Sequence, residues 1–306
     1  MKNIVVIGSA NADRIMALPH LPAVGETVTE GVFSQAYGGK GANQAVAAAR
    51  AGGSVAFISA VGDDAEGAAI RENCVRDGIV TTALLTVPGV PTGAALVLFD
   101  TAGRNYLAVA PGANYSLTPE DIALHADTIR AAAYVVMQME IPVDTTLAAL
   151  EIARTAQVPV LFNFAPVRTR DVPVTNAMTG LIVNENEAAE LTGLPMTNRA
   201  EAEAGADALL ARGPRFVIVT LGADGAWVAE TDGARTHLPA FEVTPVDTTA
   251  AGDTFCGALA AALTEGQSLA GACRFAQGAA ALSVTKAGAQ SSIPYRAEIE
   301  AFLLGH

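Results

Sequence analysis

Short apolar runs rich in β-branched residues alternate with alanine-rich segments along most of this 306-residue chain. The runs that have the length of buried strands are Ile4–Ile7, Val55–Ala60, Tyr134–Met137, Val158–Phe164, Leu181–Val183 and Phe216–Thr220. The intervening segments with helical spacing of apolar residues are Ala42–Ala51, Ala65–Asp77, Pro119–Ala131, Asp144–Ala156, Glu187–Thr192 and Arg199–Ala211. Strands that alternate with helices predict an α/β fold of three layers (αβα), in which helices flank a mainly parallel central sheet.

Two stretches lack crossover helices and interrupt this pattern. Residues 14–37 contain the strand-like runs Ile15–Leu18 and Thr27–Tyr37, and residues 91–110 contain Ala94–Phe99, a turn at Asp100–Gly103, and Asn105–Ala110. We expect two antiparallel hairpins that together form a small β-sheet standing over the carboxyl edge of the main sheet. The α/β domain would then comprise residues 1–13, 38–90 and 111–306, with final helices at Gly252–Leu263, Leu269–Lys286 and Arg296–Leu303.

The chain is strongly acidic, with a formal net charge of −13. Nucleic-acid phosphates recruit clusters of Lys and Arg, so this charge argues against a nucleic-acid partner. A phosphorylated small molecule is still compatible with it. Such a ligand needs only a local anion site built from backbone N–H groups, a few cationic side chains or a metal ion.

The three cysteines, Cys74, Cys256 and Cys273, are too few and too scattered for a disulfide framework or a zinc site. We expect each of them to be a small buried apolar residue. The apolar run Ile4–Ile7 is too short for a signal peptide, and the apolar stretch around Phe255–Leu263 is bounded by Asp253 and Glu265, so it is not a membrane span. These features predict a cytoplasmic protein that does not enter the membrane.

Ligands of open α/β sheets bind at the carboxyl ends of the strands, so the polar residues that follow predicted strands are candidates for a site. Asn11 and Asp13 follow the first strand, and an amide next to a carboxylate suits adjacent sugar hydroxyl groups. The alternative interpretation of these two residues is an Asx turn. Glu140 follows a later strand, and its alternative interpretation is a solvated loop carboxylate.

The run Gly38-Gly39-Lys40-Gly41-Ala42-Asn43-Gln44 opens a predicted helix. It is not a phosphate-binding P-loop, because the required upstream glycine and the Ser or Thr after the lysine are missing. A glycine-rich helix start lets backbone and ligand approach closely, with Lys40 and Asn43 nearby. An ordinary turn at the start of a helix is the alternative.

Asn184 and Glu187 follow another strand and lie three residues apart, so they share one face of a first helical turn. An oxygen pair of this kind can hold a hydrated Mg²⁺ beside a phosphate chain. The same pair also fits an ordinary capping box, in which Asn184 caps the helix and Glu187 occupies its third position. The pattern alone does not separate these two interpretations.

The run Asp247–Phe255 leads through small residues into a long helix. The backbone N–H groups of Ala251, Gly252 and Asp253 are expected to point at one spot, which forms an anion hole strengthened by the helix dipole. A carboxylate in an anion hole repels the bound anion. The arrangement makes sense if the carboxylate accepts a hydroxyl proton while the N–H groups bind a phosphoryl group. Asp253 is therefore a candidate base. The alternative is an aspartate that only complements the dipole.

Together these motifs resemble those of the ribokinase-like carbohydrate kinase family, in the family's order and over nearly the whole chain. The matching runs are Gly8–Asp13, Gly38–Gln44, Asn184–Glu187, Thr220–Gly225, Asp247–Gly257 and Lys286–Gln290. The resemblance implies an ATP-dependent sugar kinase that uses Mg²⁺ and a monovalent cation, K⁺. It also implies that the small sheet is a lid and that a homodimer forms through it.

The resemblance assigns roles residue by residue. The sugar would be bound by Asn11, Asp13, Gly39, Lys40, Asn43, Glu140 and Asp253. Catalysis would use Asp253 as the base and, as the anion hole, Ala250, Ala251 and Gly252. The nucleotide would contact Asn184, Thr220, Gly222, Gly225, Gly252 and Gln277. Mg²⁺ would be held at Asn184 and Glu187. The monovalent cation would be held by loops that contain Asp247, Thr249, Ser283, Lys286, Gly288 and Ser292.

The implied reaction transfers the γ-phosphoryl group of ATP to the primary hydroxyl, O5, of D-ribose and gives ribose 5-phosphate and ADP. A kinase for 2-deoxyribose or for a nucleoside is an open alternative, the latter because Phe33, Tyr37 and Phe99 offer aromatic rings for stacking. A sugar-sensing protein on a kinase scaffold is the non-enzymatic alternative. A sensor would have no need to keep Asp253, which favours the enzyme.

Overall fold

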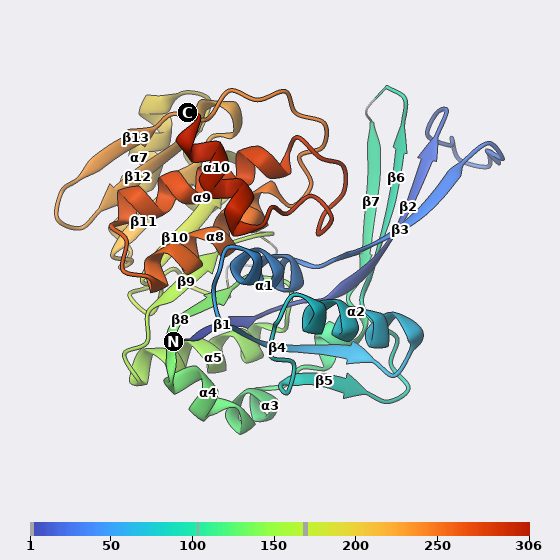
Figure 1. Cartoon of the computed structure of the whole chain (residues 1–306), viewed down its shortest axis with the longest axis horizontal. Coiled ribbons are helices and arrows are strands. Elements are labelled where there is room, and N and C mark those ends of the chain that lie inside the picture. The colour runs from blue at the N-terminus through green and yellow to red at the C-terminus, as the bar shows by residue number, and fades with distance from the viewer. Residues whose placement is uncertain (1–2, 103, 168–170) are drawn as a thin grey trace.

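The computed structural model describes residues 3–102, 104–167 and 171–306. A three-layer α/β body carries a smaller sheet that extends from one side (Figure 1). The strand order of the main sheet is β13-β12-β11-β10-β9-β8-β1-β4-β5. In chain order these strands are β1 (Asn3–Ile7), β4 (Val55–Gly62), β5 (Leu84–Val87), β8 (Ala132–Met137), β9 (Val160–Asn163), β10 (Gly180–Asn184), β11 (Phe216–Thr220), β12 (Ala226–Glu230) and β13 (Arg235–Leu238). Pairing is parallel from β11 to β5 and antiparallel for β12 and β13 at the other edge.

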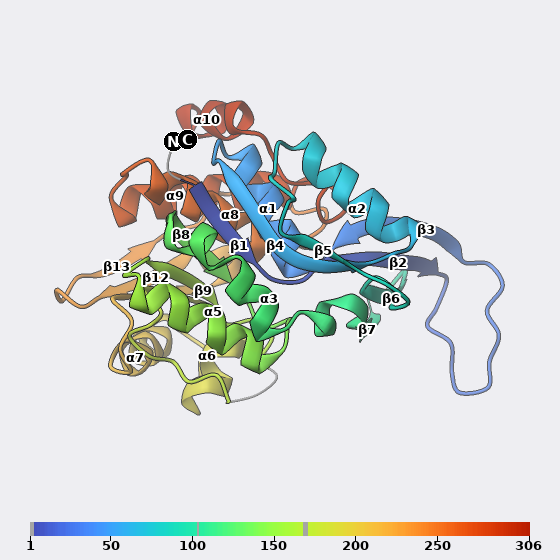
Figure 2. The same ribbon diagram turned by 90° about the horizontal axis from the view of Figure 1, so that it is seen from below.

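Helices cover both faces of the main sheet, as Figure 2 shows. One face carries α1 (Lys40–Arg50), α2 (Ala65–Arg76), α8 (Ala251–Thr264), α9 (Leu269–Ser283) and α10 (Arg296–Leu304). The other face carries α3 (Pro119–Leu124), α4 (Ala126–Arg130), α5 (Val143–Thr155), α6 (Glu185–Thr192) and α7 (Arg199–Leu210). Side chains of β1 alternate between the two layers: Ile4 and Val6 enter the first core, and Val5 and Ile7 enter the second. The three-layer prediction is confirmed.

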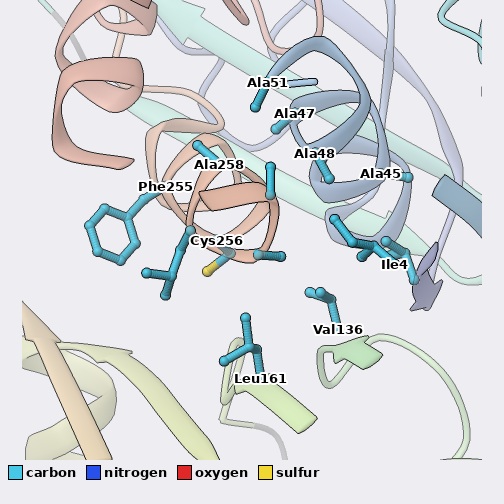
Figure 3. Packing of buried hydrophobic residues seen from close by; sticks show 14 of the residues in the cluster. Ile4, Ala45, Ala47, Ala48, Ala51, Val136, Leu161, Phe255, Cys256 and Ala258 are labelled. Atoms are coloured by element: carbon cyan, nitrogen blue, oxygen red, sulfur yellow. The ribbon is translucent and has the colours of Figure 1, made fainter. Parts of the chain in front are cut away.

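The helices α1 and α8 lie side by side against the sheet and are packed mainly through alanines (Figure 3). Ala47 and Ala48 of α1 and Ala258 of α8 are all buried in this core. Gly257 of α8 permits the close approach, because a Cβ atom there would lie 2.5 Å from the Gln44 carbonyl oxygen of α1. Small side chains on both helices thus bring their N-terminal turns together at the carboxyl edge of the sheet.

The smaller sheet, called the lid sheet below, consists of β2 (Asn11–Leu18), β3 (Val32–Gly38), β6 (Ala94–Asp100) and β7 (Asn105–Ala110) in the order β3-β2-β6-β7. Both predicted hairpins are antiparallel, and β2 joins them by pairing in parallel with β6. Because β2 begins at Asn11, the predicted domain boundary between residues 13 and 14 falls inside this strand. Asn11 and Asp13 therefore belong to the lid sheet.

Several predicted elements differ from the structure. The helix expected over Pro119–Ala131 is two short helices, α3 and α4, because His125 between them leaves the helical conformation (φ −106°, ψ 15°). The strand expected from Thr27 starts only at Val32, and α9 ends at Ser283 rather than at Lys286. Of the predicted turn at Asp100–Gly103, Gly103 lies outside the described residues.

Strands β5, β12 and β13 were not predicted from the sequence. The strands β12 and β13 follow β11 in an antiparallel meander without a crossover helix, so the βαβ pattern does not reveal them.

The three cysteines are free and buried, as predicted. In the part of the chain that the structure describes, none of the helices has both the length and the apolar character needed to cross a membrane.

Candidate active site

Asp253 lies in the first turn of α8 and is 6 % exposed. Burial raises the pKa of its carboxyl group above the ordinary value, whereas the Lys40 ammonium and hydrogen bonds from Asn43 and Gln44 act in the opposite direction. The two hydrogen bonds reach different oxygens: Asn43 Nδ2 donates to Oδ2 at 2.9 Å and Gln44 Nε2 donates to Oδ1 at 2.9 Å. The carboxylate is thus desolvated, charge-compensated and fixed at both oxygens.

The N-terminus of α8 provides backbone N–H groups beside this carboxylate. The residue before the helix, Ala250, adopts a left-handed conformation (φ 60°) and turns the chain into the helix. The Ala251 N–H donates to the Thr248 carbonyl at 3.3 Å, so it is already engaged. A Cβ atom on Gly252 would meet no atom of the described residues within 4 Å, which shows that the backbone is approachable there. Gly252 and Asp253 therefore offer the better N–H groups for an anion.

The start of α1 is shaped by Gly39, the residue before the helix. Its backbone is left-handed (φ 84°), and a Cβ atom would lie 2.9 Å from both Ala10 Cα and the Asn11 nitrogen. Only glycine satisfies both demands. This contact holds the beginning of α1 against the end of β1, and so brings Lys40 next to the carboxyl edge of the sheet.

Lys40 lies among carboxylates. Burial alone would lower the pKa of its ammonium group, but Asp253, Glu140 and Glu187 together raise it, so the group stays charged. Glu140 accepts two hydrogen bonds at Oε2, one from the Lys40 backbone N–H at 3.0 Å and one from Ser9 Oγ at 2.5 Å. Glu140 is therefore not a free loop carboxylate; it ties the loop after β8 to the starts of α1 and β2.

The lid sheet carries Asn11 and Asp13. Asn114 fixes the Asn11 amide, because its Nδ2 donates to Asn11 Oδ1 at 2.8 Å while its own Oδ1 accepts from the Ala10 N–H at 2.8 Å. This leaves the Asn11 NH₂ group as the free donor. Burial and the neighbouring Glu140 raise the pKa of Asp13 to about 6. Among the described residues, none hydrogen-bonds Asp13 Oδ1, although that atom is buried.

Asn184 and Glu187 form the capping box of α6. The Glu187 N–H donates to Asn184 Oδ1 at 2.8 Å, and the Asn184 N–H donates to Glu187 Oε2 at 2.9 Å. Burial raises the pKa of Glu187, with a further upward contribution from Asp253, and Lys40 opposes the rise. The capping interpretation is therefore correct. The charge of Asp253 also raises the pKa of Glu187, which indicates that these two carboxylates lie near each other.

Of the predicted nucleotide residues, Gly225 and Gln277 are brought together near the antiparallel edge of the sheet, whereas Gly252 lies apart from them at the start of α8. Thr220 ends β11, and Gly222 and Gly225 belong to the turn that leads into β12. A Cβ atom on Gly225 would clash with the Leu238 carbonyl oxygen, and Gln277 Nε2 donates to that same oxygen at 3.0 Å. Gln277 is 7 % exposed, and within the described ranges its Oε1 has no partner.

The loops predicted to hold a monovalent cation are joined to one another. Asp247 Oδ1 accepts from the Thr249 N–H at 2.9 Å, and its Oδ2 accepts from the Gly288 N–H at 2.8 Å. These hydrogen bonds outweigh the effect of burial and lower the pKa of Asp247. Ser283, the last residue of α9, and Ser292 are fully buried, and their hydroxyl groups donate to the Ala280 and Ala289 carbonyls, each at 2.8 Å.

The Lys286 ammonium points elsewhere, toward Glu298 at 2.8 Å. Only the backbone of Lys286 is therefore available to a cation between these loops.

The sequence interpretation missed several residues that build the site. Gln44, Gln138 and Asn163 form a buried amide chain behind Asp253, and Asn114 orients Asn11. Gln44 stands next to the predicted Asn43, so helical spacing from Lys40 was a usable signal. The other three follow strands or sit in a short 3₁₀ turn, where no pattern distinguishes them.

A buried carboxylate beside open helix-terminal N–H groups, at the carboxyl edge of a parallel sheet and below a β lid, defines a phosphotransferase that acts on a hydroxyl group. The family comparison agrees with this class. Residues 1–296 match the model of the pfkB family carbohydrate kinases, and the chain belongs to that family.

Three relatives illustrate the similarity. The chain is 40% identical to the ribokinase of Haemophilus influenzae over 302 residues, which cover 99% of this chain and 98% of the relative. It is 36% identical to the deoxyribokinase of Salmonella typhi, covering 95% of each. A solved structure of Arabidopsis thaliana ribokinase complexed with ribose and ATP superposes with a TM-score of 0.91 at 31% identity, covering 99% of this chain and 98% of that one.

Proposed function

We propose that this chain transfers the γ-phosphoryl group of ATP to O5 of D-ribose and forms ribose 5-phosphate and ADP. The observation that carries the proposal is the position of Asp253, buried and held by two amide donors at the mouth of the α8 N-terminus. The likeness to a ribokinase from Haemophilus influenzae and to a ribokinase that binds ribose and ATP supports the choice of substrates.

In this mechanism the protein aligns the reactants and compensates charge, as phosphoryl transfer requires. The sugar binds between the lid sheet and the body, where the Asn11 amide donates, the Asp13 carboxylate accepts and Lys40 adds positive charge. Asp253 orients the hydroxyl group and takes its proton late, as the oxygen bonds to phosphorus and grows acidic. The N–H groups of Gly252 and Asp253 stabilise the transferred phosphoryl group.

The fit of a divalent cation depends on Glu187. Its Oε2 is used in the capping box, while its Oε1 has no hydrogen bond recorded to a described residue. Among the described residues no group of three or more His, Cys, Asp or Glu side chains could hold a metal ion. A Mg²⁺ ion would therefore take its other ligands from water and from ATP phosphates, as is usual for this ion. When bound, it would neutralise phosphate charge.

The loops joined by the hydrogen bond between Gly288 and Asp247 would hold a monovalent cation through backbone oxygens. Such a cation would stabilise the loop that leads into α8 and so the anion hole. We expect K⁺ to raise kcat relative to Na⁺ at equal ionic strength. Equal rates in the two salts would contradict this part of the proposal.

The lid sheet favours a free sugar over a nucleoside. Strand register pairs Phe33 with Met16 and Tyr37 with Ala12, so both rings lie on the face opposite Asp13. Phe99 pairs with Ala17 and shares the Asp13 face. Two of the three aromatic residues that suggested a nucleoside are thereby removed from the sugar side.

The Asp13 face of the lid sheet also supports the proposed homodimer. Leu107 (66 % exposed) and Val109 (38 % exposed) pair with Val97 and Ala95 on this face, so two exposed apolar side chains of β7 lie on it, and exposed apolar surface of this kind suits an interface. We propose that two lid sheets pack through it. Leu107→Glu should convert the dimer to a monomer in sedimentation equilibrium, and a wild-type monomer would refute the pairing.

The proposed function is tested by ADP release with ribose, 2-deoxyribose, nucleosides and fructose phosphates. We expect the largest kcat/KM with ribose and a loss of about 10²–10⁴-fold in kcat for Asp253→Ala, with sugar and ATP binding retained. Asp144→Ala is the matched control, because Asp144 also lies in the first turn of a helix, α5, but outside the site. Wild-type-like turnover by Asp253→Ala would overturn the assignment.

A higher kcat/KM with 2-deoxyribose would favour the second candidate, which the deoxyribokinase of Salmonella typhi supports at 36% identity. Both candidates use the same base, so the Asp253→Ala result holds for either sugar.

A further inference from the structure

Gln44 is fully buried (0 % exposed) and has hydrogen-bond partners on three different segments. Its Nε2 donates to Asp253 Oδ1 at 2.9 Å and to Asn163 Oδ1 at 3.1 Å. Its Oε1 accepts from Gln138 Nε2 at 2.7 Å. Both polar atoms of the Gln44 side chain are thus hydrogen-bonded within the protein, and Nε2 donates to the proposed base, Asp253.

The direction of this amide chain is fixed by its surroundings. Asn163 Nδ2 donates to the Ile182 carbonyl at 3.2 Å, which turns Asn163 Oδ1 toward Gln44. An inverted Gln44 amide would bring its oxygen against two acceptor oxygens, those of Asn163 and Asp253, and its nitrogen against that of Gln138. Gln44 can therefore only donate to Asp253.

Packing of α1 against α8 sets the distance between Gln44 and Asp253. Gly257 lies one turn after Asp253, and a Cβ atom there would be 2.5 Å from the Gln44 carbonyl oxygen and 2.6 Å from Ala47 Cβ. Any larger residue would push the helices apart. The same close approach that builds the core thus brings the Gln44 amide to the carboxylate.

We propose that Gln44 is a positioning residue that holds the Asp253 carboxylate in the orientation needed to receive the substrate hydroxyl. The inference rests on the proposed function, in which Asp253 is the base. Asn43 holds Oδ2 and Gln44 holds Oδ1, so two successive residues of α1 fix a carboxylate carried by α8. Without the Gln44 donor, the carboxylate can rotate about its broad χ2 torsion. A displacement of about 1 Å costs roughly 10²-fold in rate.

The charged and titratable groups that face Asp253 are Lys40 on α1, Glu140 after β8, Glu187 on α6 and Cys256 on α8. Hydrogen bonds to the charged form lower the pKa of a carboxyl group, so the Gln44 donor acts against the rise that burial causes. The variants below leave these four groups unchanged. In the uncharged variant Gln44→Met, a shift in the Asp253 titration therefore reports loss of the Gln44 donor.

The experiment compares Gln44→Met with Gln138→Met. The first variant removes the donor to Asp253, and the second removes a buried amide of the same size from the same chain but leaves that donor in place. For Gln44→Met we expect kcat to fall by about tenfold or more with the ribose KM changed by less than about threefold. We also expect the acid limb of the kcat profile to move up by roughly one to two pH units. Gln138→Met should leave the acid limb in place.

Gln44→Glu is the second variant, because it keeps the side-chain volume and remains informative if Gln44→Met does not fold. It sets a carboxylate against Asp253, so the acid limb should move upward by charge repulsion as well as by loss of the donor, and an unmoved limb would show that the side chain of residue 44 does not act on Asp253. An acid limb that stays in place in the folded Gln44 variants would show that Gln44 only fills the core, even if kcat and thermal stability fall together. That result would overturn the proposal.

A direct titration separates this inference from the proposed function. The Asp253 carboxyl signal can be followed by ¹³C NMR of aspartate-labelled protein and assigned with Asp253→Ala. If the wild type does not phosphorylate ribose, the proposed function fails, yet an upward shift of this signal in Gln44→Met still supports the positioning role. An unshifted signal contradicts that role whatever the activity.

Discussion

The body and the lid sheet hold their carboxylates in different ways. On the body side, Asp253 accepts an amide donor at each oxygen, and both donors come from α1. On the lid side, Asp13 receives a hydrogen bond from the Ala95 backbone, but its buried Oδ1 has no partner in the described ranges. Burial raises the pKa of both groups, so desolvation alone does not explain the difference.

The difference indicates what each carboxylate is for. A base must meet the reacting hydroxyl in one geometry, and Asp253 is fixed before any ligand arrives. A binding group can instead leave its hydrogen-bonding capacity for the ligand, because a buried oxygen without a partner costs about 1–3 kcal/mol that a sugar hydroxyl can recover. The body side is thus arranged for the chemical step, and the lid side for recognition of the sugar.

The largest effect that would break this arrangement is expected from Gly39→Ala. The new Cβ atom would lie 2.9 Å from Ala10 Cα in a left-handed backbone (φ 84°), so the start of α1 must shift. That shift displaces Lys40, Asn43 and Gln44 together relative to Asp253. We expect kcat/KM for ribose to fall by about 10²-fold or more.

Gly78→Ala is the control for Gly39→Ala. Gly78 has a similar left-handed backbone (φ 76°), but a Cβ atom there meets no described atom within 4 Å. It should lose about 1–2 kcal/mol of stability with kcat/KM unchanged. If the two variants lose activity equally, backbone strain rather than the position of α1 explains the effect.

A smaller and different effect is expected from Asp13→Asn. The substitution removes a charged acceptor on the lid side and leaves both donors to Asp253 in place. Hydrogen bonds to charged groups contribute about 1.5–3 kcal/mol, so the ribose KM should rise by roughly 10–10²-fold with kcat changed by less than about threefold. Steady-state kinetics with ribose as the varied substrate measure both. A fall in kcat with an unchanged KM would assign Asp13 to the chemical step.

Much of the fold could be predicted from the sequence because its signals are local. Strands such as Ile4–Ile7 and helices such as Ala65–Asp77 are encoded by periodicity, and both predictions agree with the structure. The end of α3 at His125 was not predictable, because the apolar periodicity continues through it. The pair β12 and β13 has no crossover helix to mark it, so alternation gave no signal.

The candidate site was predictable only where a motif carries it. Asp253 and Asn43 lie in runs with glycine and small residues that stand out in the sequence. Gln138 and Asn163 contribute through contacts with residues about a hundred positions away, and a single buried amide after a strand has no distinctive pattern. Asn184 and Glu187 show a different limit of sequence analysis. Their motif is recognisable, but it fits both a capping box and a pair of metal ligands.

A pH series sharpens the comparison further. The pKa of Asp13 is about 6, so the free protein loses this charged acceptor as the pH falls through 6. Below that value the ribose KM should rise by about tenfold per pH unit until the fold itself fails. Asp13→Asn should remove this dependence, while the acid limb of kcat, which reports Asp253, stays in place. A wild-type KM that is flat between pH 5 and 7 would contradict the lid-side role.

The smallest expected effect concerns the stability of the free protein. The folded-state pKa of Asp13, about 6, lies above the ordinary aspartate value of 3.8, so the folded state binds the proton more tightly than the unfolded state does. Stability therefore falls as the pH rises from about 4 to 6, by up to about 3 kcal/mol. Asp13→Asn carries no such charge. Its free energy of unfolding at pH 7, measured in urea without ribose, should exceed that of the wild type by about 1 kcal/mol or more. A variant that is less stable at pH 7 would mean that Asp13 stabilises the lid sheet, rather than leaving its oxygen free to bind the sugar.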